Sequence, residues 1–308
     1  MPPRLPFEPL RLAHAPLRRP ESDARLAGLV SAGSRPRLPG SAGGLIALVL
    51  LALMMVVAAA PPAGAMPRSV NSTSAKSPKG TVLIVHGGGW KQTSDAEISL
   101  MRPIAKAFND AGWSTRIQAQ HGGLRSYADV INGVASLKKS IGSGPLCLYG
   151  ESSGGHLALL TAAAMGDRVR CVIAAAAPTW LDIPGDTGDH QYVRGLAISA
   201  FTERALGVFS PLAYAAQTRA QILMVHAEND PLIAPWQAQM YAALKPGTRT
   251  VLLPPGDVRW IHSDVSYHSR RCAAAASGCC PSSPAMPLAR RRAFADGSSG
   301  AMRVFTSP

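Results

Sequence analysis

The chain is poor in acidic residues, with 18 Asp and Glu against 31 Lys and Arg. The resulting net charge of +13 would suit a nucleic-acid-binding protein if the basic side chains gathered on a folded domain. They do not, because residues 66–268 hold 18 basic and 14 acidic side chains, whereas the two ends together hold 13 basic against 4 acidic. The excess is mostly terminal, and we expect no nucleic-acid partner.

Cysteine is also scarce, with five among 308 residues, and the eight histidines are scattered along the chain. No two histidines show metal-ligand spacing beside a carboxylate or a cysteine pair. The sequence therefore indicates no metal and no other cofactor.

Only one apolar run is long, the 16 residues 45–60. It is followed by Ala63-Gly64-Ala65, which resembles a signal-peptidase cleavage site. We expect residues 1–65 to be a disordered basic N-terminus plus a signal peptide, and the protein to be secreted or held in the cell envelope. The alternative is an uncleaved membrane anchor at residues 45–60, because the run approaches the length that spans a bilayer. In that case the segment would be the protein's only membrane contact.

The whole chain is 47% apolar, which is ample for a core. Residues 66–80 are predicted to be a polar linker without strands, and residues 269–308 a disordered low-complexity tail. Between them, apolar strands alternate with helical patterns at 97–111, 127–141 and from 153 onward. The expected strands, apolar on both faces, are 81–85, 113–117, 146–149, 169–177, 221–225 and 249–253. This pattern predicts a doubly wound α/β domain over 81–268, with a mostly parallel sheet of about six strands covered by helices on both faces.

The stretch Gly150-Glu151-Ser152-Ser153-Gly154 lies between a short apolar strand and an Ala- and Leu-rich helix. It fits G-x-S-x-G, in which serine occupies a strained strand-to-helix turn and the flanking glycines, Gly150 and Gly154, let the backbone close tightly. At such a turn the hydroxyl stands at the positive end of a helix. We interpret Ser152 as a nucleophile.

A second motif, His86-Gly87-Gly88-Gly89-Trp90, directly follows a buried strand and lies 66 positions before Ser152. Successive glycines free backbone N–H groups to face a ligand oxygen. Together the two motifs resemble the α/β-hydrolase superfamily, in its esterase and lipase branch, over about residues 80–268. The resemblance implies an oxyanion hole formed by the N–H groups of Gly88, Gly89 and Ser153, with His86 shaping the loop.

A nucleophilic serine needs a histidine to take its proton and a carboxylate to orient that histidine. In the resembling family these follow the serine in the order acid, then histidine. Asp230 lies just past a strand and matches the acid, with Glu228 as its rival. His262, in the loop after the last strand, is the preferred base, and His268 is the alternative.

Two further features leave alternatives open. The loop-rich region 178–219 is a candidate lid that would line the acyl pocket. Cys147 and Cys171 lie on strands expected to be adjacent, where they could form a disulfide in an exported protein or remain two buried thiols.

We therefore expect a secreted serine esterase that cleaves short-chain carboxylic esters through an acyl-enzyme intermediate, with a small-molecule ester as its only partner. A peptidase, amidase or formamidase of the same fold is the first alternative, because the same triad cleaves amides. The second is a catalytically impaired binding protein, since the unusual C-terminal segment departs from the family's closing helix.

Overall fold

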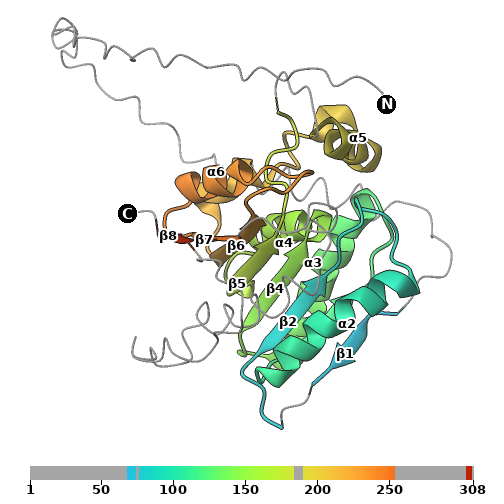
Figure 1. The fold of residues 1–308 in the computed structure, drawn as a ribbon. Helices are drawn as coiled ribbons and strands as arrows, with labels where there is room; N and C mark the ends of the chain where they lie inside the picture. Colours follow the sequence, from blue (N-terminus) through green and yellow to red (C-terminus); the bar gives the residue numbers. More distant parts are fainter. Residues whose placement is uncertain (1–67, 74–75, 184–189, 254–302, 307–308) are drawn as a thin grey trace, which may run out of the picture. The chain divides into compact units, whose positions relative to one another are not determined.

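The central element is an eight-stranded sheet with the order β1-β3-β2-β4-β5-β6-β7-β8 (Figure 1). The computed structural model describes residues 68–73, 76–183, 190–253 and 303–306. The six strands β2 to β7 are parallel, and the two edge strands pair antiparallel to their neighbours. The strands are β1 Val70–Ser72, β2 Thr81–Val85, β3 Ser114–Gln118, β4 Leu146–Glu151, β5 Cys171–Ala175, β6 Gln221–Ala227, β7 Arg249–Leu253 and β8 Arg303–Thr306.

The central strands β2, β4 and β5 are mostly apolar along their length because both faces of the sheet are covered there, whereas β3 reads Ser-Thr-Arg-Ile-Gln. All five residues of β2 are buried, and they alternate between two separate cores. Leu83 and Val85 belong to the core shared with α3, α4 and α6, whereas Val82 and Ile84 belong to the core shared with α2. Helices thus lie on both faces, and the predicted doubly wound α/β sheet is confirmed.

The helices follow the strands in regular alternation. α2 (Asp95–Asp110) begins after Ser94, whose N–H donates to the Glu97 carboxylate at 2.8 Å, and this arrangement is typical of a helix start. The other helices are α3 Leu124–Ile141, α4 Ser153–Met165, α5 His190–Phe201 and α6 Trp236–Leu244, with short 3₁₀ turns at Gly166–Arg168, Glu203–Ala205 and Pro211–Gln217.

The strand order reverses direction beside β2. The chain passes from β2 to β3 on one side and then returns to place β4 on the other side of β2. In open α/β sheets, ligands bind at such a reversal, outside the carboxyl ends of the strands. The segment after β2 contains the triple glycine and the segment after β4 contains Ser152, so both motifs meet at this position.

The sequence missed three elements. The prediction that residues 66–80 contain no strand was wrong, because β1 pairs with β3, and the Ser72 and Thr115 hydroxyl groups lie 2.8 Å apart. The prediction of disorder does not hold for residues 303–306, which form β8 beside β7. Helix α6 was not anticipated. Both edge strands are too short, at three and four residues, to show an apolar period.

A disulfide joins Cys147 to Cys171, and their Cα atoms are 4.6 Å apart. The two residues are direct partners in the parallel pairing of β4 with β5. Of the two alternatives left open by the sequence, the structure has the bridge. Across the helices the structure describes, none is both long and apolar enough to cross a membrane; residues 1–67, where the signal peptide or anchor is predicted, lie outside the described residues.

Candidate active site

Ser152 occupies the turn between β4 and α4. Its backbone has φ +51° and ψ −123°, a conformation that non-glycine residues rarely adopt. The Ser152 N–H donates to the carbonyl of Ala175 on β5 at 2.9 Å, which ties the turn to the neighbouring strand. The strand, sharp turn and helix that the motif predicted are therefore present.

The glycines on either side of Ser152 are required by close backbone packing. A Cβ at Gly150 would lie 2.3 Å from the carbonyl oxygen of Gly154, and a Cβ at Gly154 would lie 2.1 Å from that of Val85 on β2. Neither neighbour is a flexible side-chain end, so neither can move aside at low cost. The turn thus packs directly against the end of β2, where the triple glycine begins.

The loop after β2 passes beside the serine. Gly88, Gly89 and Trp90 all have positive φ, at 100°, 67° and 59°. A Cβ at Gly87 would lie 3.3 Å from the Cβ of Ser152. Successive N–H groups in such a conformation form a concave anion-binding surface.

Ser153 adds a donor from the other side. As the first residue of α4 it has no intrahelical acceptor for its N–H, and the helix N-terminus carries partial positive charge. Ser152, Ser153, Gly88 and Gly89 line one pocket of about 280 Å³. The structure thus brings the predicted nucleophile and the predicted oxyanion donors to a common cavity.

Much of the remaining pocket lining is apolar. Tyr192, Val193 and Leu196 of α5 contribute to it, together with Leu232 and Pro178. The prediction that region 178–219 lines the pocket is consistent with this placement. Lys91 and Glu151 also line the pocket, and sequence reasoning assigned neither of them to the site, although each is adjacent in sequence to a motif residue.

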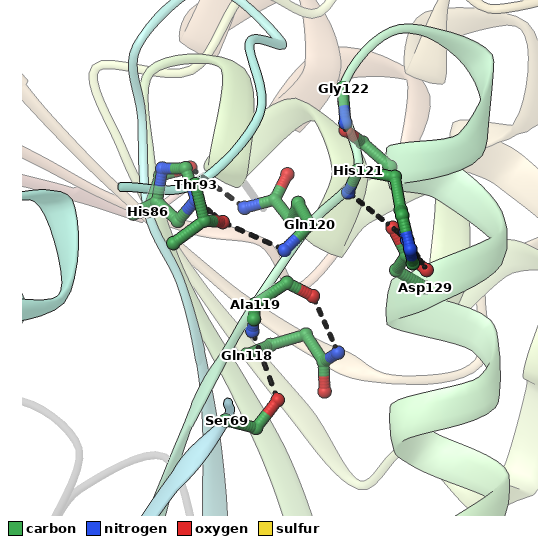
Figure 2. Close-up of polar contacts among 10 residues, drawn as sticks. Ser69, His86, Thr93, Gln118, Ala119, Gln120, His121, Gly122 and Asp129 are labelled. Carbon is green, nitrogen blue, oxygen red and sulfur yellow. Dashed lines mark hydrogen bonds and ion pairs between the residues drawn. The ribbon is translucent and has the colours of Figure 1, made fainter. Parts of the chain in front are cut away.

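His86 is buried and lies beside Thr93 (Figure 2). Both of its ring nitrogens contact the loop. Nδ1 lies 2.6 Å from the Gly87 carbonyl oxygen, and Nε2 lies 2.6 Å from Thr93 Oγ1. A carbonyl only accepts, so Nδ1 carries the proton. Burial lowers the pKa of His86 and keeps the ring neutral, so Nε2 accepts a hydrogen bond from the Thr93 hydroxyl. With both nitrogens engaged, His86 shapes the loop, as the sequence indicated.

His121 and Asp129 hold the adjacent turn (Figure 2). Asp129 accepts hydrogen bonds from the His121 N–H at 2.7 Å and from its ring Nδ1 at 2.9 Å. Two residues on, the Gly123 N–H donates to the Trp90 carbonyl at 2.7 Å. The start of α3 is thereby bonded to the end of the glycine loop.

Trp90 connects the loop to the helix after the nucleophile. Its indole N–H donates to His156 Nδ1 at 3.1 Å, and His156 Nε2 donates to the Phe209 carbonyl at 2.7 Å. Complete burial lowers the pKa of His156 to about 3, so the ring is neutral. Phe201 packs against both rings and stacks on Phe209 with centroids 4.4 Å apart. Loop, α4 and α5 therefore form one packed unit.

Asp230 lies three residues beyond β6 and is buried, with 8% exposure. Its Oδ1 accepts the N–H groups of Leu232 and Ile233, both at 2.9 Å, and Oδ2 lies 3.4 Å from His226 Nε2. Glu228, the rival acid, is exposed. A fixed, buried carboxylate at a strand end suits an orienting role better than an exposed one. His262 and His268 lie outside the described residues.

In the part of the chain that the structure describes, no three His, Cys, Asp or Glu side chains group as metal ligands would.

Comparison with known proteins gives a family match over part of the chain. Residues 107–253 match the model of the prolyl oligopeptidase family. The match covers slightly less than half of the chain and includes Ser152 and Asp230. No curated protein sequence matches.

Many solved structures resemble this one at low sequence identity. An acetyl ester-xyloside bifunctional hydrolase from Caldicellulosiruptor lactoaceticus is 14% identical with a TM-score of 0.56, over 70% of this chain and 89% of that one. An esterase from Pyrobaculum calidifontis is 17% identical with a TM-score of 0.53, over 81% and 96%. Est1E from Butyrivibrio proteoclasticus, with bound ferulic acid, is 14% identical with a TM-score of 0.52, over 69% and 94%. At these low identities, the structural likeness shows a shared fold alone.

Proposed function

This chain has the α/β-hydrolase fold, and from that premise we propose that it is a serine hydrolase that cleaves short-chain carboxylic esters. One observation carries the proposal: Ser152, in a strained turn at the strand-order reversal, shares a pocket with three consecutive glycines and the N-terminus of α4. A serine beside convergent backbone donors is the arrangement that acyl transfer needs.

In the proposed reaction, Ser152 Oγ attacks the acyl carbon while His262 takes the hydroxyl proton and Asp230 orients His262. The carbonyl oxygen becomes an oxyanion held by the N–H groups of Gly88, Gly89 and Ser153. Loss of one such donor costs about 3–4 kcal/mol in the activation free energy. The intermediate then expels the alcohol, which receives the proton from His262, and water releases the acid from Ser152 by the same steps.

The size of the pocket supports a small acyl group. Its volume of about 280 Å³ lies below the range of about 300–1,000 Å³ that is typical of pockets for drug-sized ligands. The apolar part of its lining, formed by Val193, Leu196 and Leu232, favours a hydrocarbon chain or ring over a charged group.

Amide or peptide cleavage is the second candidate, because the matched family model is that of prolyl oligopeptidases. The same nucleophile and oxyanion donors serve both reactions, and the leaving group makes the difference. A comparison of ester and anilide substrates with the same acyl group separates the two candidates.

We further propose that the protein is exported, with the hydrophobic segment 45–60 as signal peptide or anchor. The disulfide between Cys147 and Cys171 supports this, because stable disulfides form mainly in oxidising compartments. Mass spectrometry of exported protein should place the N-terminus near Met66. Recovery of the full-length chain in the membrane fraction would favour the anchor.

The proposed activity is tested with nitrophenyl esters of graded chain length, beside the matching anilides. We expect turnover of the short esters, with labelling of Ser152 by a fluorophosphonate probe, and loss of both in Ser152→Ala. Ser140→Ala is the matched control, since Ser140 lies on α3 and donates to the Leu137 carbonyl. Turnover unchanged in Ser152→Ala, or labelling at Ser153, would refute the assignment.

A further inference from the structure

A buried chain of hydrogen bonds connects the end of β3 to the glycine loop (Figure 2). The Gln120 N–H donates to Thr93 Oγ1 at 2.7 Å, and the Thr93 N–H donates to the Gln120 carbonyl at 2.9 Å. Thr93 Oγ1 lies 2.6 Å from His86 Nε2, and His86 Nδ1 lies 2.6 Å from the Gly87 carbonyl oxygen. Thr93 and Gln120 are 3% and 1% exposed, so water does not compete for these bonds.

The direction of each proton in this chain is fixed. Because the Gly87 carbonyl can only accept, Nδ1 of His86 carries the ring proton, and Thr93, which accepts the Gln120 N–H, donates its hydroxyl proton to Nε2. Nε2 of His86 then accepts, and a neutral ring that accepts at Nε2 carries its proton on Nδ1. That proton is donated to the Gly87 carbonyl. The Thr93 hydroxyl and the Gly87 carbonyl therefore stabilise the same tautomer of His86.

The Gly87 carbonyl belongs to the same peptide unit as the Gly88 N–H. A trans peptide is planar, and its C=O and N–H point in opposite directions. A bond that fixes the carbonyl against His86 therefore also fixes the direction of the Gly88 N–H. The loop needs such an external contact, because glycine backbone rotates more freely than that of other residues.

We infer that Thr93 is a positioning residue for the oxyanion hole: through His86 it holds the Gly87–Gly88 peptide with the Gly88 N–H directed at the substrate oxyanion. This inference rests on the proposed function and adds a residue that does not line the pocket. Since the oxyanion forms only in the transition state, Thr93 acts on the chemical step and leaves ground-state binding alone.

The test compares Thr93→Val, which removes the hydroxyl at nearly constant volume, with Thr93→Ser, which keeps it. We expect Thr93→Val to lower kcat by about 10-fold to 100-fold with KM within about threefold, and Thr93→Ser to restore kcat to within about threefold. The expected loss is smaller than for deletion of a direct donor, because Gly88 keeps its N–H.

Thr218→Val is the matched control. Thr218 is also 3% exposed, and its hydroxyl donates to the Tyr214 carbonyl at 3.0 Å, away from the pocket. Both valine variants lose a buried hydroxyl bond, so both should unfold at lower denaturant concentration, but only Thr93→Val should lose kcat. Equal kcat in the two variants, a loss confined to KM, or failure of Thr93→Ser to restore kcat would overturn the inference.

A second measurement is independent of turnover. In protein labelled with ¹⁵N-histidine, long-range proton–nitrogen correlation spectra distinguish the two neutral tautomers. We expect His86 to carry its proton on Nδ1 in the wild type and in Thr93→Ser, and to show the Nε2 tautomer at increased population in Thr93→Val. An Nε2 proton in the wild type would overturn the inference. A wild-type protein without esterase activity would instead refute the proposed function.

Discussion

Glycine at position 152 should give a more stable protein than alanine at the same position, and both variants should be inactive. Ser152 has φ +51° and ψ −123°. L-residues with a side chain rarely adopt this conformation, because the Cβ lies too close to the residue's own backbone. Alanine at the same position removes the nucleophile but keeps the Cβ and hence the strain. The difference in the free energy of unfolding between Ser152→Gly and Ser152→Ala therefore reports the backbone strain at position 152.

The expected difference follows from two opposing terms. A non-glycine residue in such a region costs about 1–3 kcal/mol, which glycine recovers. Glycine also gains conformational entropy in the unfolded chain, which costs about 0.4–1 kcal/mol in return. We expect Ser152→Gly to be more stable than Ser152→Ala by about 1 kcal/mol, or about 2–4 °C in Tm for a domain of this size.

Urea denaturation of the two variants, followed by tryptophan fluorescence, gives the free energies directly. Ala135→Gly serves as the sign control, because Ala135 lies within the regular helix α3 and glycine there should destabilise by about 1 kcal/mol. If Ser152→Gly were no more stable than Ser152→Ala, the turn would store no strain, and the argument from its backbone angles would be refuted.

Three other predictions concern residues that the sequence or the structure singles out. His262→Ala should lower kcat by about 10⁴-fold with little change in folding, whereas His268→Ala should lower kcat by less than about tenfold. The reverse order in steady-state kinetics would make His268 the base. Replacing Cys147 and Cys171 together by alanine should lower the free energy of unfolding by about 3 kcal/mol in denaturant titrations, since the bridge closes a loop of about 25 residues; free thiols in the native protein that react with an alkylating agent would contradict the bridge. Burial lowers the pKa of His156 to about 3, so below pH 6.5 this histidine binds a proton in the unfolded chain but not in the native state. The free energy of unfolding should therefore fall by about 2 kcal/mol from pH 6.5 to pH 5, and by less in His156→Gln.

The sheet was predictable where the chain is buried on both sides. Strands such as Thr81–Val85 and Cys171–Ala175 are nearly continuous apolar runs, as parallel strands covered on both faces must be. All six predicted strands are present, although β3 reads Ser-Thr-Arg-Ile-Gln and departs from this pattern. The edge strands carry no such signal. β1 reads Val-Asn-Ser and is partly exposed, so only its pairing with β3 defines it.

The residues of the site likewise fall into those that a local sequence pattern predicts and those that it does not. Ser152 and the glycines were found from sequence because their spacing reflects backbone geometry that only a few residue types allow. Tyr192 and Leu196 reach the pocket from α5, a distant part of the chain, and no local pattern marks them. The position of Thr93 could not be predicted from the sequence, because its role depends on two partners, His86 and Gln120, that the fold brings together from the ends of neighbouring strands.

The disulfide has a mechanical consequence. It closes residues 147–171 into a covalent ring that contains Ser152 and the whole of α4. A force applied to the two ends of the chain passes through the sulfur atoms and bypasses this ring. Stretched at constant force, the oxidised chain should be shorter than the reduced one by the contour of 24 residue steps, or about 80 Å at about 3.4 Å per residue. The segment that holds the nucleophile is thus the part of the sheet that tension cannot extend until the bond is reduced.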